Sequence, residues 1–181
     1  MNGRKRVVVF ISGSGSNMEK LAEACEAPGF PAEIVAVISD KLDAGGLPKA
    51  KARGIATYAL ARKDYDSKQA HEAAMLGLLA DLAPDFICLA GFMRLLSGDF
   101  IRAYEGRIIN IHPSLLPLFP GLHTHARAIE AGCAVHGCTV HEVTGELDLG
   151  PILGQAVVPV LPGDDPDALK AASIYIVTVP T

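Results

Sequence analysis

An asparagine and a histidine two residues apart are the clearest candidates for catalytic chemistry. Asn110 and His112 lie in the segment NIHPSLLP, at the C-terminal end of an apolar run that predicts a strand. Residues two apart on an extended backbone point to the same side, and Pro113 favours an extended His112. An amide beside an imidazole suits acyl transfer, because the amide can stabilise an oxyanion while the imidazole moves a proton. The alternative is a strand-capping asparagine beside a buried histidine.

A carboxylate should complete this group, either by orienting the imidazole or by accepting a proton. The acidic residues nearby in the sequence are Glu142, Glu146 and Asp148. Asp148 lies between two leucines in a loop flanked by glycines, a partly apolar setting in which a carboxylate needs a partner. We therefore predict that Asp148 is the third catalytic residue and that Glu142 and Glu146 face solvent.

A glycine-rich segment, ISGSGSN at residues 11–17, predicts an anion site. It joins a predicted strand to a predicted helix, where free backbone N–H groups and the helix dipole attract negative charge. The segment resembles the dinucleotide fingerprint, but Met18 stands at the third glycine position and the Gly-Lys-Ser/Thr of a P-loop is absent. These features favour a cradle for one phosphate over a pyrophosphate site. The alternative is a tight turn capped by serine or asparagine.

The six histidines raise the question of a metal site. His123, His125, His136 and His141 could supply ligands, but the sequence contains neither HExxH nor a Cys/His quartet of zinc spacing. A helix that starts at Thr124 accounts for the first two of these histidines. We expect no metal.

The elements that position these motifs alternate between apolar runs and helical patterns. Strands are predicted at 6–12, 34–38, 55–60, 86–90 and 107–111, and helices at 16–25, 47–53, 66–82 and 98–104. Apolar strands without polar alternation indicate a parallel sheet covered on both faces. Ligands bind such sheets at the carboxyl ends of the strands, and both polar motifs follow strands.

The second half of the sequence changes character. A helix is predicted at 124–131, and two runs at 137–143 and 152–160 predict a hairpin. The predicted fold class is α/β: a single Rossmann-like, doubly wound, mostly parallel sheet with helices on both faces and an antiparallel hairpin in the C-terminal half. We expect one domain, 1–181, with halves 1–104 and 105–181.

Composition narrows the function classes. The 181 residues are 50% hydrophobic and 20% charged with a net charge of −4, and the only basic cluster is residues 4–6, so nucleic acid is a poor partner. No apolar run reaches the roughly 18 residues that span a membrane, and the run near the N-terminus is too short for a secretory signal. The four cysteines form no CxxC pair, which favours buried free thiols in a reducing cytoplasm.

Considered together, the motifs resemble those of the phosphoribosylglycinamide formyltransferases, or glycinamide ribonucleotide transformylases, within the folate-dependent formyltransferase family. The matching segments are ISGSGSN at 11–17, AGFMRLL at 90–96, NIHPSLLPLFPGLHTH at 110–125 and HGCTVHEVTGELDLGPILGQ at 136–155. With their order they cover residues 6–162. The stretch PGLHTHARAIEAG resembles the glycinamide branch in particular.

The resemblance implies transfer of a formyl group from the co-substrate 10-formyltetrahydrofolate to the amine of glycinamide ribonucleotide in de novo purine biosynthesis. Residues 1–104 would be the phosphate-binding half, and residues 105–181 the folate-binding and catalytic half. The chain would be a cytoplasmic monomer or homodimer that acts on small molecules. The implied site residues are Gly15, Ser16 and Asn17 for the ribonucleotide phosphate; Lys68, Met93, Arg94, Leu95, Leu96, Asn110, Val143 and Thr144 for folate; and Asn110, His112 and Asp148 for catalysis.

The chain departs from the family pattern near its C-terminal end. After residues 162–166 the family has a helix with a Glu-His pair, which contributes to the ribonucleotide site, before an Ile-Tyr-Pro segment. Here residues 168–172 lead directly to 173–176 without that pair. One interpretation is an altered C-terminus that weakens substrate binding and leaves the catalytic trio intact, and the alternative is a partial record of a longer chain. The alternative functions are a formyltetrahydrofolate hydrolase, a non-catalytic folate-binding relative, and a nicotinamide-dependent oxidoreductase with Asp40 near the ribose.

Overall fold

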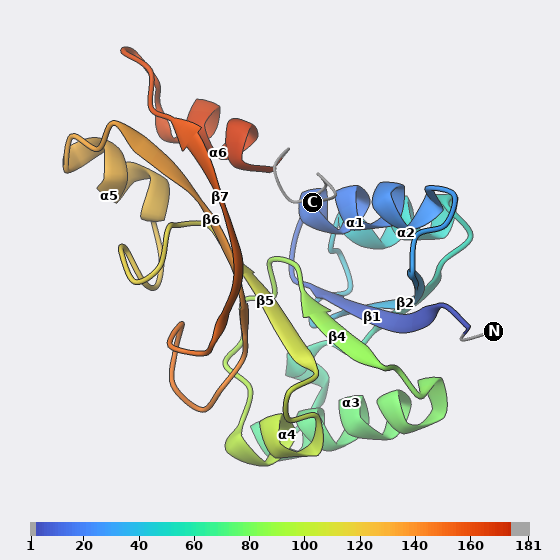
Figure 1. Ribbon diagram of the computed structural model, residues 1–181. Coiled ribbons are helices and arrows are strands. Elements are labelled where there is room, and N and C mark those ends of the chain that lie inside the picture. Colours follow the sequence, from blue (N-terminus) through green and yellow to red (C-terminus); the bar gives the residue numbers. More distant parts are fainter. Residues whose placement is uncertain (1–2, 175–181) are drawn as a thin grey trace. The chain divides into compact units, whose positions relative to one another are not determined.

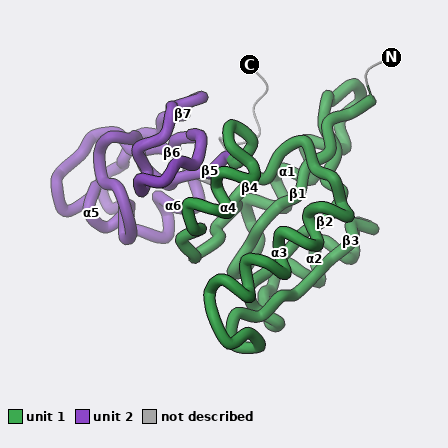
Figure 2. The backbone as a smooth tube through the Cα atoms, turned by 90° about the horizontal axis from the view of Figure 1, so that it is seen from below, with its two compact units in different colours: residues 1–108 green, residues 109–181 purple. Residues whose placement is uncertain are grey.

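The chain divides into two compact units. The computed structural model describes residues 3–174, and the units comprise residues 1–108 and 109–181 (Figure 2). The boundary between the units lies within a strand, β5 (Ile108–His112). The boundary that we predicted between the two halves, at 104/105, lies in the turn before this strand. That the chain is a single domain stays a prediction.

The first unit is a parallel sheet with helices on both faces. Its strands pair in the order β3-β2-β1-β4, and every pair is parallel. Helices α1 and α2 cover one face, whereas α3 and α4 cover the other (Figure 1). The bounds are β1 (Lys5–Ile11), α1 (Ser16–Glu26), β2 (Ala32–Ser39), α2 (Gly46–Ala52), β3 (Ala56–Ala59), the 3-10 helix η1 (Arg62–Asp64), α3 (Lys68–Leu82), β4 (Phe86–Leu89) and α4 (Gly98–Ala103).

Strand β1 explains why the sequence shows an apolar run without alternation. Its residues Val7, Val9 and Ile11 belong to the core cluster that includes Met18 of α1 and Val37 of β2. The intervening residues point to the opposite face, where the ring of Phe10 packs against those of Phe92 and Phe100 at centroid distances of 5.2 and 6.2 Å. Both faces of the strand are therefore buried.

The second unit contains an antiparallel sheet. Strand β5 pairs with β6 (Val135–Glu142), and β6 pairs with β7 (Ile152–Pro159); both pairs are antiparallel. The described part of the unit, up to residue 174, also contains the helices α5 (Thr124–Glu130) and α6 (Pro166–Ile174). The register places Asn110 opposite His141 and His112 opposite Thr139. This register brings together polar side chains that lie about 30 positions apart in the sequence.

The predicted α/β fold is confirmed, including the early parallel strands, the helices on both faces and the antiparallel hairpin near the C-terminus. The bounds predicted for the strands and for α1 to α5 agree with the observed ones to within two residues, whereas η1 and α6 were not predicted. Residues 175–181, where part of the departure from the family pattern falls, lie outside the described residues.

All four cysteines are free thiols, but only Cys138 is fully buried, so the expectation of burial is wrong for Cys25, Cys88 and Cys133, which keep some exposed surface. Burial of the thiol nevertheless raises the pKa of Cys88 to about 12, and a protonated thiol is a poor nucleophile. Among residues 3–174, no helix is long and apolar enough to cross a membrane.

Candidate functional site

The glycine-rich loop meets helix α1 at Gly15. Gly15 precedes the helix with φ of 73°, in the left-handed region that favours glycine. The first hydrogen bond of the helix runs from the Glu19 N–H to the Gly15 carbonyl, at 2.9 Å, and no side chain caps the helix. The backbone N–H groups of Ser16 and Asn17 therefore lack partners within the helix. The predicted phosphate residues lie at this helix start.

The start of α2 packs against the glycine-rich loop. The Gly46 N–H donates to the Gly13 carbonyl at 3.0 Å. A Cβ atom on Gly46 would lie 2.6 Å from Cδ1 of Ile11 and 2.9 Å from Cα of Gly15. This contact leaves room for glycine only, and the sequence analysis did not single out Gly46.

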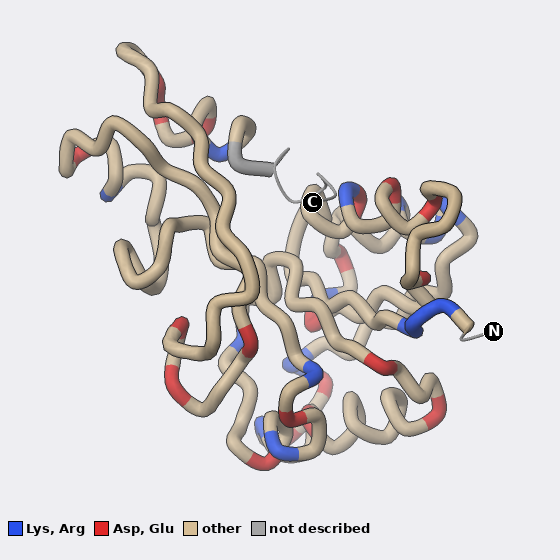
Figure 3. The backbone as a smooth tube through the Cα atoms, viewed as in Figure 1, with Lys and Arg blue, Asp and Glu red and all other residues tan. Residues whose placement is uncertain are grey.

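Lys49 of α2 and Arg53, which follows this helix, are engaged by carboxylates of α1. Lys49 lies 2.7 Å from Glu19, and Arg53 pairs with both Glu23 and Glu26 at 3.3 and 2.7 Å. In Figure 3, both blue (Lys, Arg) and red (Asp, Glu) segments of the tube occur along α1 and α2. An anion at the start of α1 would therefore depend mainly on backbone N–H groups rather than on these side chains.

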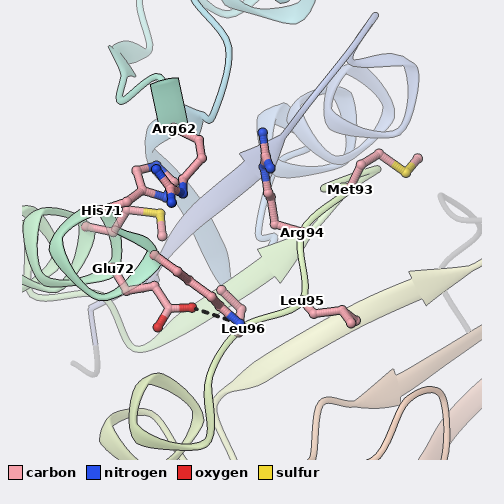
Figure 4. A pocket seen from close by; sticks show the side chains of 9 residues that line it. Arg62, His71, Glu72, Met93, Arg94, Leu95 and Leu96 are labelled. Carbon is pink, nitrogen blue, oxygen red and sulfur yellow. Dashed lines mark ion pairs between the residues drawn. The ribbon is translucent and has the colours of Figure 1, made fainter. Parts of the chain in front are cut away.

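A cavity of about 290 Å³ lies within the first unit, between α3 and the segment 93–96 (Figure 4). It brings Lys68 together with Met93, Arg94, Leu95 and Leu96, which the resemblance assigns to folate. The sequence analysis missed the remaining residues that line it: Arg62, His71, Glu72 and Met75. The polar members of this second group come from η1 and the first turns of α3, where sequence spacing alone gives no sign of a shared cavity.

Buried hydrogen bonds fix the walls of this cavity. The Glu72 carboxylate accepts the Ser97 N–H at 2.9 Å and lies 3.7 Å from the Lys68 ammonium. The hydroxyl of buried Ser12 accepts the Met93 N–H at 2.8 Å. Because Ser12 begins the glycine loop, one side chain connects that loop to the cavity wall.

In the second unit, a histidine that the sequence analysis considered only as a metal ligand orients Asn110. The Nδ1–H of His141 donates to the Glu142 carbonyl at 2.8 Å, because a carbonyl oxygen can only accept. Its Nε2 is then the acceptor for the Asn110 amide Nδ2–H at 3.1 Å. The same Nε2 lies 3.7 Å from the Asp148 carboxylate. The amide of Asn110 keeps a second N–H beyond this bond.

His112 has an acceptor oxygen at each ring nitrogen. Its Nδ1 lies 3.4 Å from Oδ2 of Asp148, and its Nε2–H donates to the Phe119 carbonyl at 3.1 Å. The His112 and Asp148 side chains are only 6% and 5% exposed. A doubly protonated ring would donate at both contacts, whereas a neutral ring has one N–H and would donate at only one of them.

Backbone contacts hold Asp148 in place. It adopts φ of 55°, and its Oδ2 accepts the Gly121 N–H at 2.9 Å. The predicted trio of Asn110, His112 and Asp148 therefore lies in one connected group, with His141 as a fourth member. Glu146 is exposed, as predicted, but Glu142 is only partly exposed.

Two other histidines of this unit, His125 and His136, pack against each other. The rings of His125 and His136 lie 5.0 Å apart, and His136 Nε2–H donates to the Pro113 carbonyl at 3.0 Å. Burial lowers the pKa of both, that of His125 to about 4. Within residues 3–174, no group of three or more His, Cys, Asp or Glu side chains is arranged to hold a metal ion.

Comparison with known proteins shows the family to which the chain belongs. The model of the family described as formyl transferase matches residues 5–174. The chain belongs to the formyl transferase family. This formyl transferase is 48% identical over 165 residues to phosphoribosylglycinamide formyltransferase of Escherichia coli, a match that covers 91% of the chain and 78% of the relative.

The solved structures agree with this assignment. The crystal structure of phosphoribosylglycinamide formyltransferase from Brucella melitensis is 65% identical to this formyl transferase, with a TM-score of 0.93 and coverage of 97% of this chain and 90% of that one.

The trifunctional purine biosynthetic protein adenosine-3 of Drosophila pseudoobscura pseudoobscura is 50% identical over 174 residues. That match covers 95% of this chain but only 13% of the longer relative.

Proposed function

We propose that this formyl transferase moves the formyl group of 10-formyltetrahydrofolate to the amine of glycinamide ribonucleotide, a step of de novo purine biosynthesis. The observation that carries the proposal is the connected group of partly buried Asn110 and buried His112 and Asp148. His112 contacts Asp148 directly at 3.4 Å, and His141 lies between Asp148 and Asn110 at 3.7 and 3.1 Å. The relatives at 48% and 65% identity bear the name of this activity.

The proposed mechanism is direct attack. The deprotonated amine forms a bond to the formyl carbon, and the electron pair of the carbonyl moves to its oxygen. The second N–H of Asn110 is available to donate to this oxyanion, since His141 engages only the first. When the tetrahedral intermediate collapses, the C–N bond to the folate breaks and tetrahydrofolate leaves. No covalent enzyme intermediate is needed, because a positioned amine is itself a competent nucleophile.

His112 and Asp148 have the remaining roles, which are stabilisation of the oxyanion and transfer of the amine proton. The carboxylate at 3.4 Å favours the imidazolium, which stabilises the oxyanion. The amine proton passes to the departing folate nitrogen, with Asp148 as the group that assists the transfer. The Nε2–H of His112 donates to the Phe119 carbonyl in this structure, so it reaches the formyl oxygen only after exchanging that acceptor.

Each substrate has a proposed binding region. The start of α1, at Gly15, Ser16 and Asn17, would hold the ribonucleotide phosphate through backbone N–H groups. The cavity lined by Lys68 and residues 93–96 would take part of the folate, and its cations suit an anionic substrate better than the net charge of −4 suggests. Asn110, Val143 and Thr144 stay proposed folate contacts, and segment 143–148 stays a proposed cover for the pterin.

The test is an assay with purified protein, 10-formyltetrahydrofolate and glycinamide ribonucleotide, which follows loss of the formyl donor. We expect turnover in the wild-type protein and a large loss in Asn110→Ala and Asp148→Asn. A wild-type rate no higher than that of these variants would overturn the proposal. Formate release without the ribonucleotide would indicate a hydrolase, and folate binding without turnover a binding protein.

The contacts of Asp40 do not favour the alternative function of a nicotinamide-dependent oxidoreductase. Asp40, the residue that this alternative places near a ribose, is buried and paired with Arg94 at 2.7 Å. We expect no binding of NAD(H) in an equilibrium titration. A cytoplasmic location and a monomeric or homodimeric state also stay proposals.

A further inference from the structure

A buried carboxylate lies behind one wall of the cavity in the first unit. Asp40 directly follows β2, and its side chain is only 1% exposed. Its Oδ2 accepts a hydrogen bond from Nε of Arg94 at 2.7 Å. Its Oδ1 is buried and has no hydrogen-bond partner among the described residues. A buried carboxylate needs a compensating charge, so the bond to Arg94 is its principal support.

Arg94 bridges this buried carboxylate and the cavity. Its side chain is 46% exposed and lines the cavity. In Figure 4 it extends from segment 93–96 towards the side of the cavity that carries Arg62. A guanidinium has five N–H donors in one rigid plane. Because Asp40 engages Nε, the Nη groups stay available to a ligand, and their plane is set by the bond behind them.

The other two cations of the cavity are held differently. Lys68 lies 3.7 Å from Glu72, and its ammonium can rotate about several bonds. Arg62 donates through Nη1 to the Tyr65 carbonyl at 2.7 Å, so one of its outer donors is already used. Among these three cations, only Arg94 combines a buried anionic partner at Nε with unengaged outer donors.

We propose that Asp40 is a positioning residue for the folate co-substrate and acts by fixing the guanidinium of Arg94. The proposal rests on the proposed function, since it assumes that the cavity receives folate. Asp40 itself is buried and touches no ligand. Its contribution is preorganisation: a cation held in place before binding loses less conformational freedom when the ligand arrives.

The first experiment compares two substitutions at this position. Asp40→Ala removes the acceptor, and we expect the KM for 10-formyltetrahydrofolate to rise about tenfold, with kcat and the KM for glycinamide ribonucleotide within twofold of wild type. Asp40→Asn keeps an oxygen that can accept the Arg94 Nε–H, so it should restore most of the affinity. A purely structural role would instead lower the fraction of active protein, and with it the apparent kcat, without a selective change in KM.

A double-mutant cycle tests whether Asp40 acts through Arg94. In an Arg94→Gln background, Asp40→Ala should add less than a twofold change in folate KM, because the group that it positions is gone. If the changes in folate KM caused by Asp40→Ala and Arg94→Gln multiply in the double variant, the two residues act independently and the proposal is overturned. Asp99→Asn is the matched control: it removes an arginine-paired carboxylate that is exposed on α4, and we expect wild-type kinetics.

Two further measurements keep the test decisive. If Asp40→Ala does not fold, Arg94→Lys addresses the same relationship. The lysine ammonium can still pair with Asp40, but lysine lacks the planar Nη groups that Arg94 presents to the cavity. A wild-type folate KM in that variant overturns the proposal. Calorimetric titration with 10-formyltetrahydrofolate alone measures folate binding without turnover. It therefore tests the positioning role of Asp40 separately from the proposed formyl transfer. Weaker folate binding in Asp40→Ala supports the positioning role even if no formyl transfer occurs, whereas unchanged binding contradicts it.

Discussion

The carboxylate of Asp148 lies between the ring of His112, at 3.4 Å, and the backbone N–H of Gly121, at 2.9 Å, and the same oxygen atom makes both contacts. The Gly121 N–H fixes the carboxylate, and the carboxylate fixes the orientation of the imidazole. Since both side chains are buried, water screens their interaction only weakly. The pair is therefore suited to hold a positive charge next to a developing oxyanion.

We predict that Asp148→Asn lowers kcat by about a hundredfold to ten-thousandfold. The amide can still accept the Gly121 N–H, so the fold should persist, but it no longer favours the imidazolium of His112. Steady-state kinetics measure the loss, and thermal unfolding should show a Tm close to wild type. A variant that keeps more than a tenth of the wild-type kcat would show that the carboxylate is dispensable.

We predict that His141→Leu lowers kcat by about tenfold to a hundredfold, because small misplacements of a catalytic group are costly. The Asn110 amide would lose the acceptor that holds its Nδ2 at 3.1 Å. The KM values for both substrates should change less than threefold, which distinguishes loss of orientation from loss of binding. An unchanged kcat would mean that Asn110 is held by other contacts.

We predict that Gly46→Ala raises the KM for glycinamide ribonucleotide by at least about fivefold while the KM for folate changes little. The added Cβ would lie 2.6 Å from Ile11 Cδ1 and 2.9 Å from Gly15 Cα, so the glycine loop must shift. Such overpacking usually costs about 1–3 kcal/mol of stability. Initial-rate kinetics with each substrate varied in turn measure the effect.

Gly77→Ala is the matched control for this substitution. Gly77 lies within α3, and an added Cβ there would meet no atom within 4 Å. We expect wild-type kinetics and a gain in stability of roughly 0.5–1 kcal/mol, since alanine favours a helix more than glycine does. If both variants show the same kinetic change, the argument from close contact at Gly46 fails.

We predict that the protein loses stability on acidification through protonation of His125. Burial, followed by the charges of His136 and Lys170, lowers the pKa of His125 from 6.5 to about 4. Between these two pH values the unfolded chain binds a proton that the folded chain does not, so the free energy of unfolding decreases as the pH falls from 6.5 to 4. Above pH 6.5 this group has no effect.

The measurement is the Tm as a function of pH for the wild type and His125→Gln. The variant should lose less stability than the wild type between pH 7 and 4.5. His123→Gln changes an exposed histidine two residues away and should keep the wild-type dependence. Parallel curves for wild type and His125→Gln would contradict the prediction.

Much of the fold follows from local sequence. The apolar run in β1 predicted a strand buried on both faces, because each face receives alternate residues such as Val9 and Phe10. Proline and glycine marked the ends of most helices. The motif around Asn110 and His112 carried enough chemistry to indicate acyl transfer, since residue type and two-residue spacing are properties of the chain itself.

Other features exist only because distant segments meet. The role of His141 depends on an antiparallel register that places it opposite Asn110. No local sequence pattern predicted that register. Asp40 and Arg94 are 54 positions apart, and Gly46 matters because its backbone touches Gly15.

The amino-acid sequence by itself predicted most of the element order, the fold class and the candidate catalytic side chains. The tertiary structure decided which groups orient them. The physical reason is that strand propensity and motif chemistry act over a few residues, whereas a hydrogen bond at 3 Å depends on packing that no local pattern specifies.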